Sequence, residues 1–238
     1  MKGKGITAGA LKWIAVITML IDHYGLTIYV HTTDWVYEYY RIMRYIGRIS
    51  FPIYCFLLIE GFYHTKNVKR YVLRCLMFGL VSEIPFDLAT HGSVFYLQSQ
   101  NIYFTLTTGL CMIWCLERIK GAYLVPKRWA GIVPVEYFQW GASFLCIAIG
   151  AGAAQLLEMD YHYMGILLIA ALYYCREFTP LVRSLVGAVA FAFEKTAPLA
   201  FIPIYFYNGQ RGKQNKYFFY MVYPIHLLIF GLIQKFFL

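Results

Sequence analysis

The chain has 238 residues, of which 60% are hydrophobic and 14% are charged, against roughly 45–50% and roughly 25% in soluble domains. A soluble globule of this size has too little interior to hide so much apolar surface, which excludes a soluble enzyme, a disordered chain and a secreted disulfide scaffold. The net charge of +9 fits basic residues gathered on cytoplasmic loops better than nucleic-acid binding, because no basic patch is interleaved with aromatic residues. We therefore expect a multi-pass protein of the cell membrane.

The apolar runs predict an all-α, polytopic bundle of membrane-spanning helices that forms a single domain over residues 1–238. A span needs roughly 20 mainly apolar residues, or somewhat fewer where the bilayer thins. The expected spans are 10–30, 49–62, 71–89, 102–116, 135–157, 164–175, 181–207 and 218–237. The run 181–207 is long for one helix and is interrupted by Glu194-Lys195 and Pro198, so it forms either one helix or two short ones. The bundle therefore has eight or nine transmembrane helices.

Basic residues set the expected orientation, because they favour the cytoplasmic side of a membrane. The N-terminus is expected in the cytoplasm, and segments 90–100 and 158–163, which hold no Lys or Arg, are expected outside. The basic loop 208–217 falls on the cytoplasmic side only if 181–207 makes two spans. The residues behind this assignment are Lys2, Lys4, Lys12, Lys66, Lys69, Arg70, Arg74, Arg118, Lys120, Lys127 and Arg128.

Three arginines fall on the predicted outer side, against this rule. Arg41, Arg44 and Arg48 follow i, i+3, i+7 spacing, which places them on one face of a helix. An interfacial helix that turns into the second span would carry such a stripe.

The six cysteines all lie in apolar stretches and form no C-x-x-C motif. We interpret them as reduced packing residues, neither a metal site nor a disulfide framework. The sequence also lacks a nucleophile elbow, a phosphate-binding glycine loop, a zinc pattern and a dinucleotide-binding fingerprint. Candidate functional residues are therefore the ionisable groups within the spans, each of which costs roughly 2.5–3.5 kcal/mol at bilayer depth and needs a partner or a task.

Asp22 and His23 are the first such pair. Histidine is the usual residue for moving a proton near neutral pH. Adjacent side chains on a helix diverge by about 100°, so Asp22 is expected to meet a cation from another helix, with Arg48 as the candidate. The pair is equally consistent with a functional site and with a structural Asp–Arg clamp beside a histidine bonded to a carbonyl.

Two further pairs have i, i+4 spacing on one helix face. Glu60 and His64 form either a catalytic dyad or a helix-end ion pair, and Glu83 and Asp87 require a cation or a shared proton between them. Pro85 frees a backbone carbonyl beside this second pair, which suits the lining of a polar cavity. His226 is expected to be a hydrogen-bonded core histidine. The residues alone leave a transferase and a proton-coupled carrier open.

Several motifs together resemble the TraX family, over about residues 10–235. They are LKWIA (11–15), MLIDHYG (19–25), RYIGRISFPI (44–53), EGF (60–62), SEIPFD (82–87), NIYFTL (101–106), YNG (207–209) and YMVYPIH (220–226). The family is named for the conjugal-transfer protein that acetylates the N-terminus of F-type pilin. It is similar in outline to transmembrane acyltransferases, which take an acyl group from cytoplasmic acetyl-CoA to an acceptor within or across the membrane.

This resemblance implies an acetyltransferase whose acyl donor is acetyl-CoA. His23 would act as the general base or as a transient acyl carrier, and Asp22 would orient the site by pairing with Arg48. Glu83 and Asp87 would line the acceptor pocket, with Glu60 and His64 as second choices for catalytic groups. Cationic groups for the CoA phosphates would come from the cytoplasmic face, beside a turn with accessible amides, although ordinary membrane anchoring explains the same cations. These cofactor-binding candidates are Arg70, Arg74, Asn208, Arg211 and Lys213.

The acetyltransferase interpretation predicts a cavity from the basic cytoplasmic face to His23. The alternative is a proton-coupled transporter that uses Asp22, His23, Glu83 and Asp87 as a relay. A peptide amine, a sugar hydroxyl and a lipid head group all require the same base, so the acceptor is left open. The expected partners are membrane lipids, acetyl-CoA and this acceptor, without nucleic acid, and the oligomeric state is left open.

Overall fold

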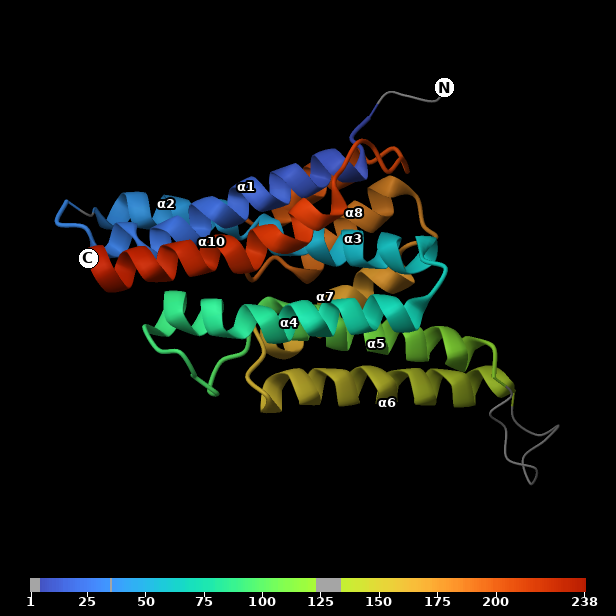
Figure 1. Ribbon diagram of the computed structural model, residues 1–238. Helices are drawn as coiled ribbons and strands as arrows, with labels where there is room; N and C mark the ends of the chain where they lie inside the picture. The colour runs from blue at the N-terminus through green and yellow to red at the C-terminus, as the bar shows by residue number, and fades with distance from the viewer. Residues whose placement is uncertain (1–4, 35, 123–133) are drawn as a thin grey trace.

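The protein is an all-α bundle whose long helices run nearly parallel to one another (Figure 1). The computed structural model describes residues 5–34, 36–122 and 134–238, so Lys2, Lys4, Lys127 and Arg128 lie outside the described residues. The helices are α1 (Ala8–Thr27), η1 (Tyr29–His31), α2 (Tyr37–Gly47), α3 (Ser50–His64), α4 (Val68–His91), α5 (Ile102–Lys120), α6 (Val135–Leu156), α7 (His162–Tyr174), α8 (Pro180–Ala190), η3 (Ala197–Ala200), α9 (Phe201–Tyr205) and α10 (Lys216–Phe237).

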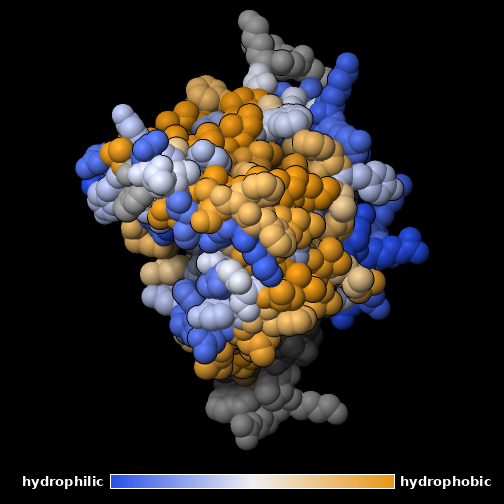
Figure 2. Space-filling model, turned by 60° about the vertical axis from the view of Figure 1, so that its left-hand side comes forward, coloured by the Kyte–Doolittle hydropathy of each residue, from blue (hydrophilic) through white to orange (hydrophobic). Residues whose placement is uncertain are grey.

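Five of the described segments are long and apolar enough to cross a membrane, which supports an integral membrane protein. Helix α4 has 24 residues but carries more charge, and α7 and α8 are shorter apolar helices. Large hydrophobic side chains cover much of the outer surface, as the broad orange area in Figure 2 shows. The five segments are Ala8–His31, Tyr37–His64, Ile102–Lys120, Val135–Leu156 and Tyr217–Phe237.

The interruption expected in 181–207 is confirmed. Helix α8 ends at Ala190, and the chain returns through η3 and α9, which packs against α8. At about 1.5 Å per residue, neither piece covers a hydrocarbon core of about 30 Å. Thr179 and Tyr207, at the two ends of this hairpin, line the same groove. The segment therefore doubles back, and loop 208–215 returns to the side from which α8 started without two complete spans.

The expected helix that carries the arginine stripe and turns into the next span is present: Arg41 and Arg44 lie on α2, and Arg48 follows its last residue. Helix α2 packs along α1 and leads into α3 after a break at Arg48 and Ile49, so both helices belong to one long candidate span. Arg41 is exposed and contacts Tyr45, whereas Arg44 and Arg48 turn to acidic partners inside the bundle.

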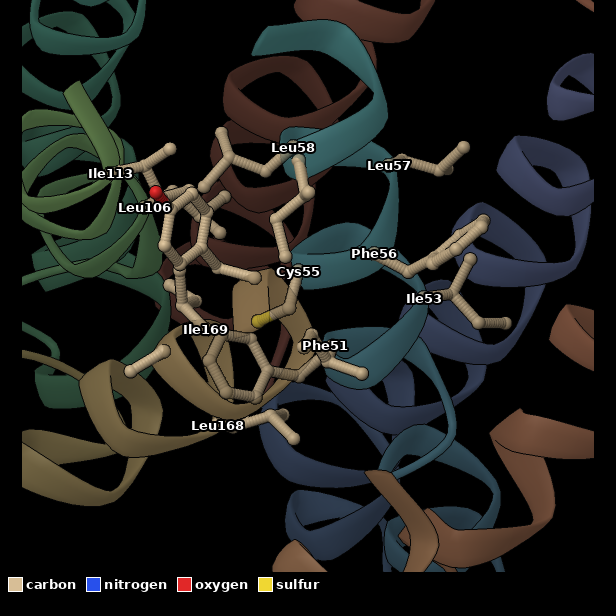
Figure 3. Packing of buried hydrophobic residues seen from close by; sticks show 14 of the residues in the cluster. Phe51, Ile53, Cys55, Phe56, Leu57, Leu58, Leu106, Ile113, Leu168 and Ile169 are labelled. Atoms are coloured by element: carbon tan, nitrogen blue, oxygen red, sulfur yellow. The ribbon is translucent and has the colours of Figure 1, made fainter. Parts of the chain in front are cut away.

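Helix α3 is the centre of the core because nearly its whole circumference is apolar and buried. It packs against α1, α5, α7 and the α9 hairpin. Phe51 and Leu58 project towards the side of α3 where Ile169 of α7 and Leu106 of α5 lie, whereas Ile53 projects towards the opposite side (Figure 3). A helix that is apolar all round is buried on every side, so α3 positions the surrounding helices.

The start of α1 is bonded to the segment that precedes α10. Ile6 N donates to Phe206 O at 2.8 Å, Ala8 N to Gln210 O at 2.9 Å and Gly9 N to Arg211 O at 3.0 Å. The first N–H groups of a helix have no partner within it, and these carbonyls supply one. The first and last long helices are thereby joined at one end of the bundle.

Gly47 allows the closest approach between α1 and α2. A Cβ atom at this position would overlap the side chain of Asp22. We therefore expect Gly47→Ala to destabilise the protein by about 1–3 kcal/mol through overpacking, measured as a lower thermal unfolding midpoint in detergent. Gly141→Ala on α6 is the matched control, because no atom lies within 4 Å of the place that its Cβ would occupy and alanine is favoured there by about 0.5–1 kcal/mol. An unchanged midpoint for Gly47→Ala would contradict the close approach.

Single cysteines in a variant without the six native ones test the orientation of the bundle. We expect a membrane-impermeant thiol reagent to label Gln98→Cys in intact cells, and to label Lys69→Cys and Lys213→Cys only after the membrane is opened. The reason is that basic loops stay in the cytoplasm and that the α8–α9 hairpin returns the chain to the same side. Labelling of Lys213→Cys from outside would contradict the hairpin.

Candidate functional site

A cavity of about 420 Å³ lies between α1, α3, α4, α5 and α10, at the end of the bundle where α1 begins. Tyrosine and leucine are the residue types that line it most often, and three cations from three segments lie beside them. Its main lining residues are Lys12, Tyr54, Leu57, Leu58, Glu60, Gly61, His64, Tyr71, Arg74, Cys75, Tyr103, Leu106, Tyr207, Gly209, Arg211, Gln214, Phe219 and Tyr220.

The three cations are Lys12 of α1, Arg74 of α4 and Arg211 of the loop before α10. Lys12 Nζ donates to Gln214 Oε1 at 2.6 Å, which holds the ammonium at the cavity edge. Arg74 and Arg211 are solvent-exposed, and no carboxylate forms an ion pair with either of them among the described residues. This edge is therefore positively charged and open to an anionic group.

The structure brings only two of the predicted CoA-phosphate cations to the cavity. Arg74 and Arg211 line it, whereas Arg70 and Lys213 are exposed away from its lining. The predicted turn at Asn208 is present, but Asn208 N already donates to Ile6 O at 3.0 Å. Gln210 N donates to Asn208 Oδ1. The Asn208 amide is therefore occupied by the protein itself, whereas Gly209, the other residue of the predicted turn, lines the cavity.

Glu60 and His64 line the cavity but do not form a side-chain dyad. His64 Nδ1 donates to the backbone oxygen of Glu60 at 2.7 Å. The Glu60 carboxylate pairs with Arg176 at 3.5 Å and is bonded by the Tyr207 hydroxyl. Both residues lie on one helix face, as their spacing predicted. The Glu60 carboxylate, however, forms its ion pair with Arg176, in the connection between α7 and α8.

His23 is paired with a second histidine, His226, near the middle of the last helix, α10. Its Nδ1 lies 2.6 Å from Nε2 of His226, and His226 Nδ1 lies 2.6 Å from the backbone oxygen of Val222. Tyr223 contacts both rings edge-on, with ring centroids 6.1 Å from His23 and 5.7 Å from His226. Two imidazoles and a phenol thus form a polar cluster in the interior.

An aromatic layer separates the cavity from this histidine pair. Tyr103 lines the cavity, and its ring lies 5.2 Å from the ring of Tyr223, which in turn covers His23. His23 is not among the cavity-lining residues. The expected open path to His23 is therefore closed by two tyrosine rings in this structure.

The predicted pairing of Asp22 with Arg48 is wrong. Arg44 Nη1 donates to Asp22 Oδ2 at 2.7 Å, and Arg48 instead pairs with Glu194 at 3.2 Å. Arg48 lies at the helix break, where it meets the tip of the α8–α9 hairpin. Burial raises the pKa of Asp160, in the loop between α6 and α7, and the nearby Arg48 guanidinium opposes this rise.

Glu83 and Asp87 do not share a cation. Glu83 accepts hydrogen bonds from the backbone and side-chain nitrogens of Asn101 at the start of α5. Asp87 Oδ2 accepts from Tyr96 N at 2.7 Å. One carboxylate oxygen of each residue, Glu83 Oε1 and Asp87 Oδ1, is buried and has no hydrogen-bond partner among the described residues.

The sequence reasoning missed His226, Tyr223 and Arg44 as parts of the site. His226 does bond a backbone carbonyl, as expected of a core histidine, but it also meets His23. The motif YMVYPIH held a usable signal, because Tyr223 and His226 have i, i+3 spacing and share one face of α10.

In the described part of the chain, no group of three or more His, Cys, Asp or Glu side chains is arranged to hold a metal ion. All six cysteines are free thiols.

Comparison with known proteins places this architecture in a family. The chain is 29% identical to the probable fimbrial assembly protein FimC, serogroup H1, of Dichelobacter nodosus, over 94% of this chain and 93% of that protein. It is 32% identical to an uncharacterized protein of Rickettsia prowazekii (strain Madrid E), over 44% of this chain and 35% of that protein. No solved structure matches the chain significantly. The family model described as TraX protein matches residues 7–234, and the chain therefore belongs to the TraX family.

Proposed function

We propose that the protein is a membrane acetyltransferase that takes an acetyl group from cytoplasmic acetyl-CoA and transfers it to an amine or hydroxyl acceptor. The observation that carries this proposal is the cavity with a cationic edge, separated from a buried histidine pair by one aromatic layer. The TraX family is linked to pilin acetylation, which agrees with this chemistry.

Three properties of the cavity support an acyl-CoA as its ligand. Its volume of about 420 Å³ lies within the range of roughly 300–1,000 Å³ for small-molecule sites. Arg74, Arg211 and Lys12 offer the charge-assisted hydrogen bonds that phosphates need. The leucine and tyrosine walls below them suit the less polar pantetheine arm, whose thioester would then point towards Tyr103.

Acetyl transfer needs a base at the inner end of this path. The acceptor nitrogen or oxygen attacks the thioester carbonyl carbon, its proton passes to His23, the C–S bond breaks and CoA leaves as a thiolate. This step requires the Tyr103–Tyr223 layer to move so that the thioester and His23 meet. A layer that closes again excludes water from the reacting groups.

An amine of a pilin-like subunit is the first acceptor to test, because a relative along almost the whole chain is named a fimbrial assembly protein. Within the part of the chain that the structure describes, Glu83 and Asp87 each keep one buried carboxylate oxygen without a hydrogen-bond partner. These oxygens are available to an approaching ammonium before it loses its proton. A sugar or lipid hydroxyl requires the same base and is the second class of acceptor.

The proton-relay alternative has less support. Asp22, His23, Glu83 and Asp87 each bond other groups, and no direct hydrogen bond links two of these four side chains in the described structure. A relay needs its members within hydrogen-bonding reach of one another or of shared water.

Binding of acetyl-CoA to the detergent-purified protein tests the donor site. We expect Arg74→Gln and Arg211→Gln each to weaken binding about tenfold or more, because each removes one charge-assisted hydrogen bond to phosphate, worth roughly 1.5–3 kcal/mol. Calorimetry with acetyl-CoA, CoA and dephospho-CoA measures the effect and shows which phosphate is held.

Arg70→Gln is the matched control, because Arg70 lies four residues before Arg74 on the same helix but outside the cavity lining. It should leave the affinity unchanged. Equal losses at both positions would indicate a general charge effect, and no binding by folded wild-type protein would overturn the proposed donor.

Replacement of the proposed base tests the transfer step. We expect His23→Gln to lower acetyl transfer about 100-fold or more, the usual effect of losing a general base, while acetyl-CoA binding and folding persist. Incorporation of radiolabelled acetyl groups into membrane acceptors provides the measurement. His162→Gln, in an exposed ion pair with Glu158, is the control and should retain activity. An active His23→Gln protein would exclude His23 as the base.

A further inference from the structure

We infer that His226 is the positioning residue for His23, and that it leaves the basic lone pair of His23 on Nε2. The tautomer follows from the hydrogen bonds alone. Its meaning for catalysis rests on the proposed function, in which His23 receives a proton from the acceptor.

The hydrogen bonds of His226 determine which of its two ring nitrogens carries the proton. Its Nδ1 lies 2.6 Å from the backbone oxygen of Val222, one turn earlier on α10. A carbonyl oxygen only accepts hydrogen bonds, so His226 Nδ1 carries a proton. In a neutral imidazole the other nitrogen is then a bare acceptor.

The proton position on His226 in turn determines which nitrogen of His23 carries a proton. Two N–H groups do not face each other at the 2.6 Å that separates His23 Nδ1 from His226 Nε2, so a single proton lies between the rings. Because Nε2 of neutral His226 accepts, Nδ1 of His23 donates. The remaining nitrogen of His23, Nε2, is left with the lone pair.

The ring geometry fits a directed hydrogen bond and not a stacked pair. The two ring planes differ by 5°, and their centroids are 4.9 Å apart. That separation equals the 2.6 Å between nitrogens plus one ring radius from each imidazole. The rings are therefore coplanar and meet edge to edge, which aligns the N–H of one with the lone pair of the other.

The surroundings hold both rings in this arrangement. Tyr223 contacts the two imidazoles from one side, and Phe230 packs edge-on against His226 at 5.6 Å. Asp22 takes no part, because its carboxylate is paired with Arg44. His226 thus fills the place that a carboxylate takes in an Asp–His pair.

A neutral partner of this kind has a clear effect on proton transfer. When His23 takes the acceptor proton on Nε2, it becomes an imidazolium whose Nδ1–H stays donated to His226. The same proton then leaves from Nε2, and neither His226 nor the Val222 carbonyl changes its proton count. His226 therefore directs which nitrogen reacts and does not itself exchange the proton.

Nitrogen NMR of the full-length protein, labelled with ¹⁵N at its histidines, tests this inference. In detergent at about pH 8, where free histidine is neutral, we expect His23 to carry its proton on Nδ1, opposite to the preference of free histidine. In His226→Phe the acceptor is lost, and the His23 signal should move to the Nε2–H form. The His23 signal is assigned by its loss in His23→Gln, and His91→Gln is a control that leaves it in place.

His226→Gln separates positioning from packing, because a glutamine oxygen also accepts a hydrogen bond from Nδ1–H of His23. We expect it to restore the Nδ1–H form and most of the acetyl transfer, whereas His226→Phe lowers transfer at least tenfold without weakening acetyl-CoA binding. A wild-type His23 protonated on Nε2 would overturn the inference even if transfer occurs. The expected tautomers in a protein without acetyl transfer would uphold the pairing and overturn only the proposed function.

Discussion

The ion pair between Arg44 and Asp22 fixes the rotation of the first helix in the bundle. A carboxylate in an apolar interior needs a partner, and Arg44 meets it at 2.7 Å. Gly47, one turn later on α2, lets the two helices approach closely enough for this contact. Because neighbouring side chains on a helix diverge by about 100°, holding Asp22 against α2 turns His23 towards α10. Asp22 therefore acts on the histidine pair indirectly, through the orientation of α1.

The same rotation arranges the interior in two compartments. The cationic cavity lies near the start of α1, and the histidine pair lies beyond the rings of Tyr103 and Tyr223. Asn101 secures this boundary by bonding Gly79 and Glu83 of α4, and its own Oδ1 caps the first turn of α5 beside Tyr103. A cationic, solvent-open end and a buried histidine end would suit the proposed acyl transfer, because water competes with any acceptor for the thioester.

The sequence predicted the positions of the helices well, but it predicted poorly which side chains pair with one another. Expected spans 102–116 and 135–157 match α5 and α6, because a bilayer imposes long apolar runs that are visible without a structure. Arg48, which directly precedes the predicted second span, was the expected partner of Asp22, but the close contact at Gly47 placed Arg44 over Asp22. His23 and His226 are 203 residues apart, and no local spacing rule relates two helices so distant in the chain.

The sequence of 181–207 showed that a helix is interrupted there. It did not show that the chain turns back to its starting side, because that turn depends on contacts with the N-terminal segment.

The hydrogen bonds between residues 6–9 and 206–211 have a consequence for biosynthesis. The first helix enters the membrane early, yet the carbonyls that cap its start and the histidine that meets His23 are translated only near the end of the chain. Until α10 inserts, α1 lacks its final neighbours and its buried polar residues depend on temporary contacts, such as those an insertase provides. A polypeptide interrupted before α10 would hold most of the hydrophobic core but neither a closed cavity nor a histidine pair. Assembly of the site is therefore coupled to completion of synthesis.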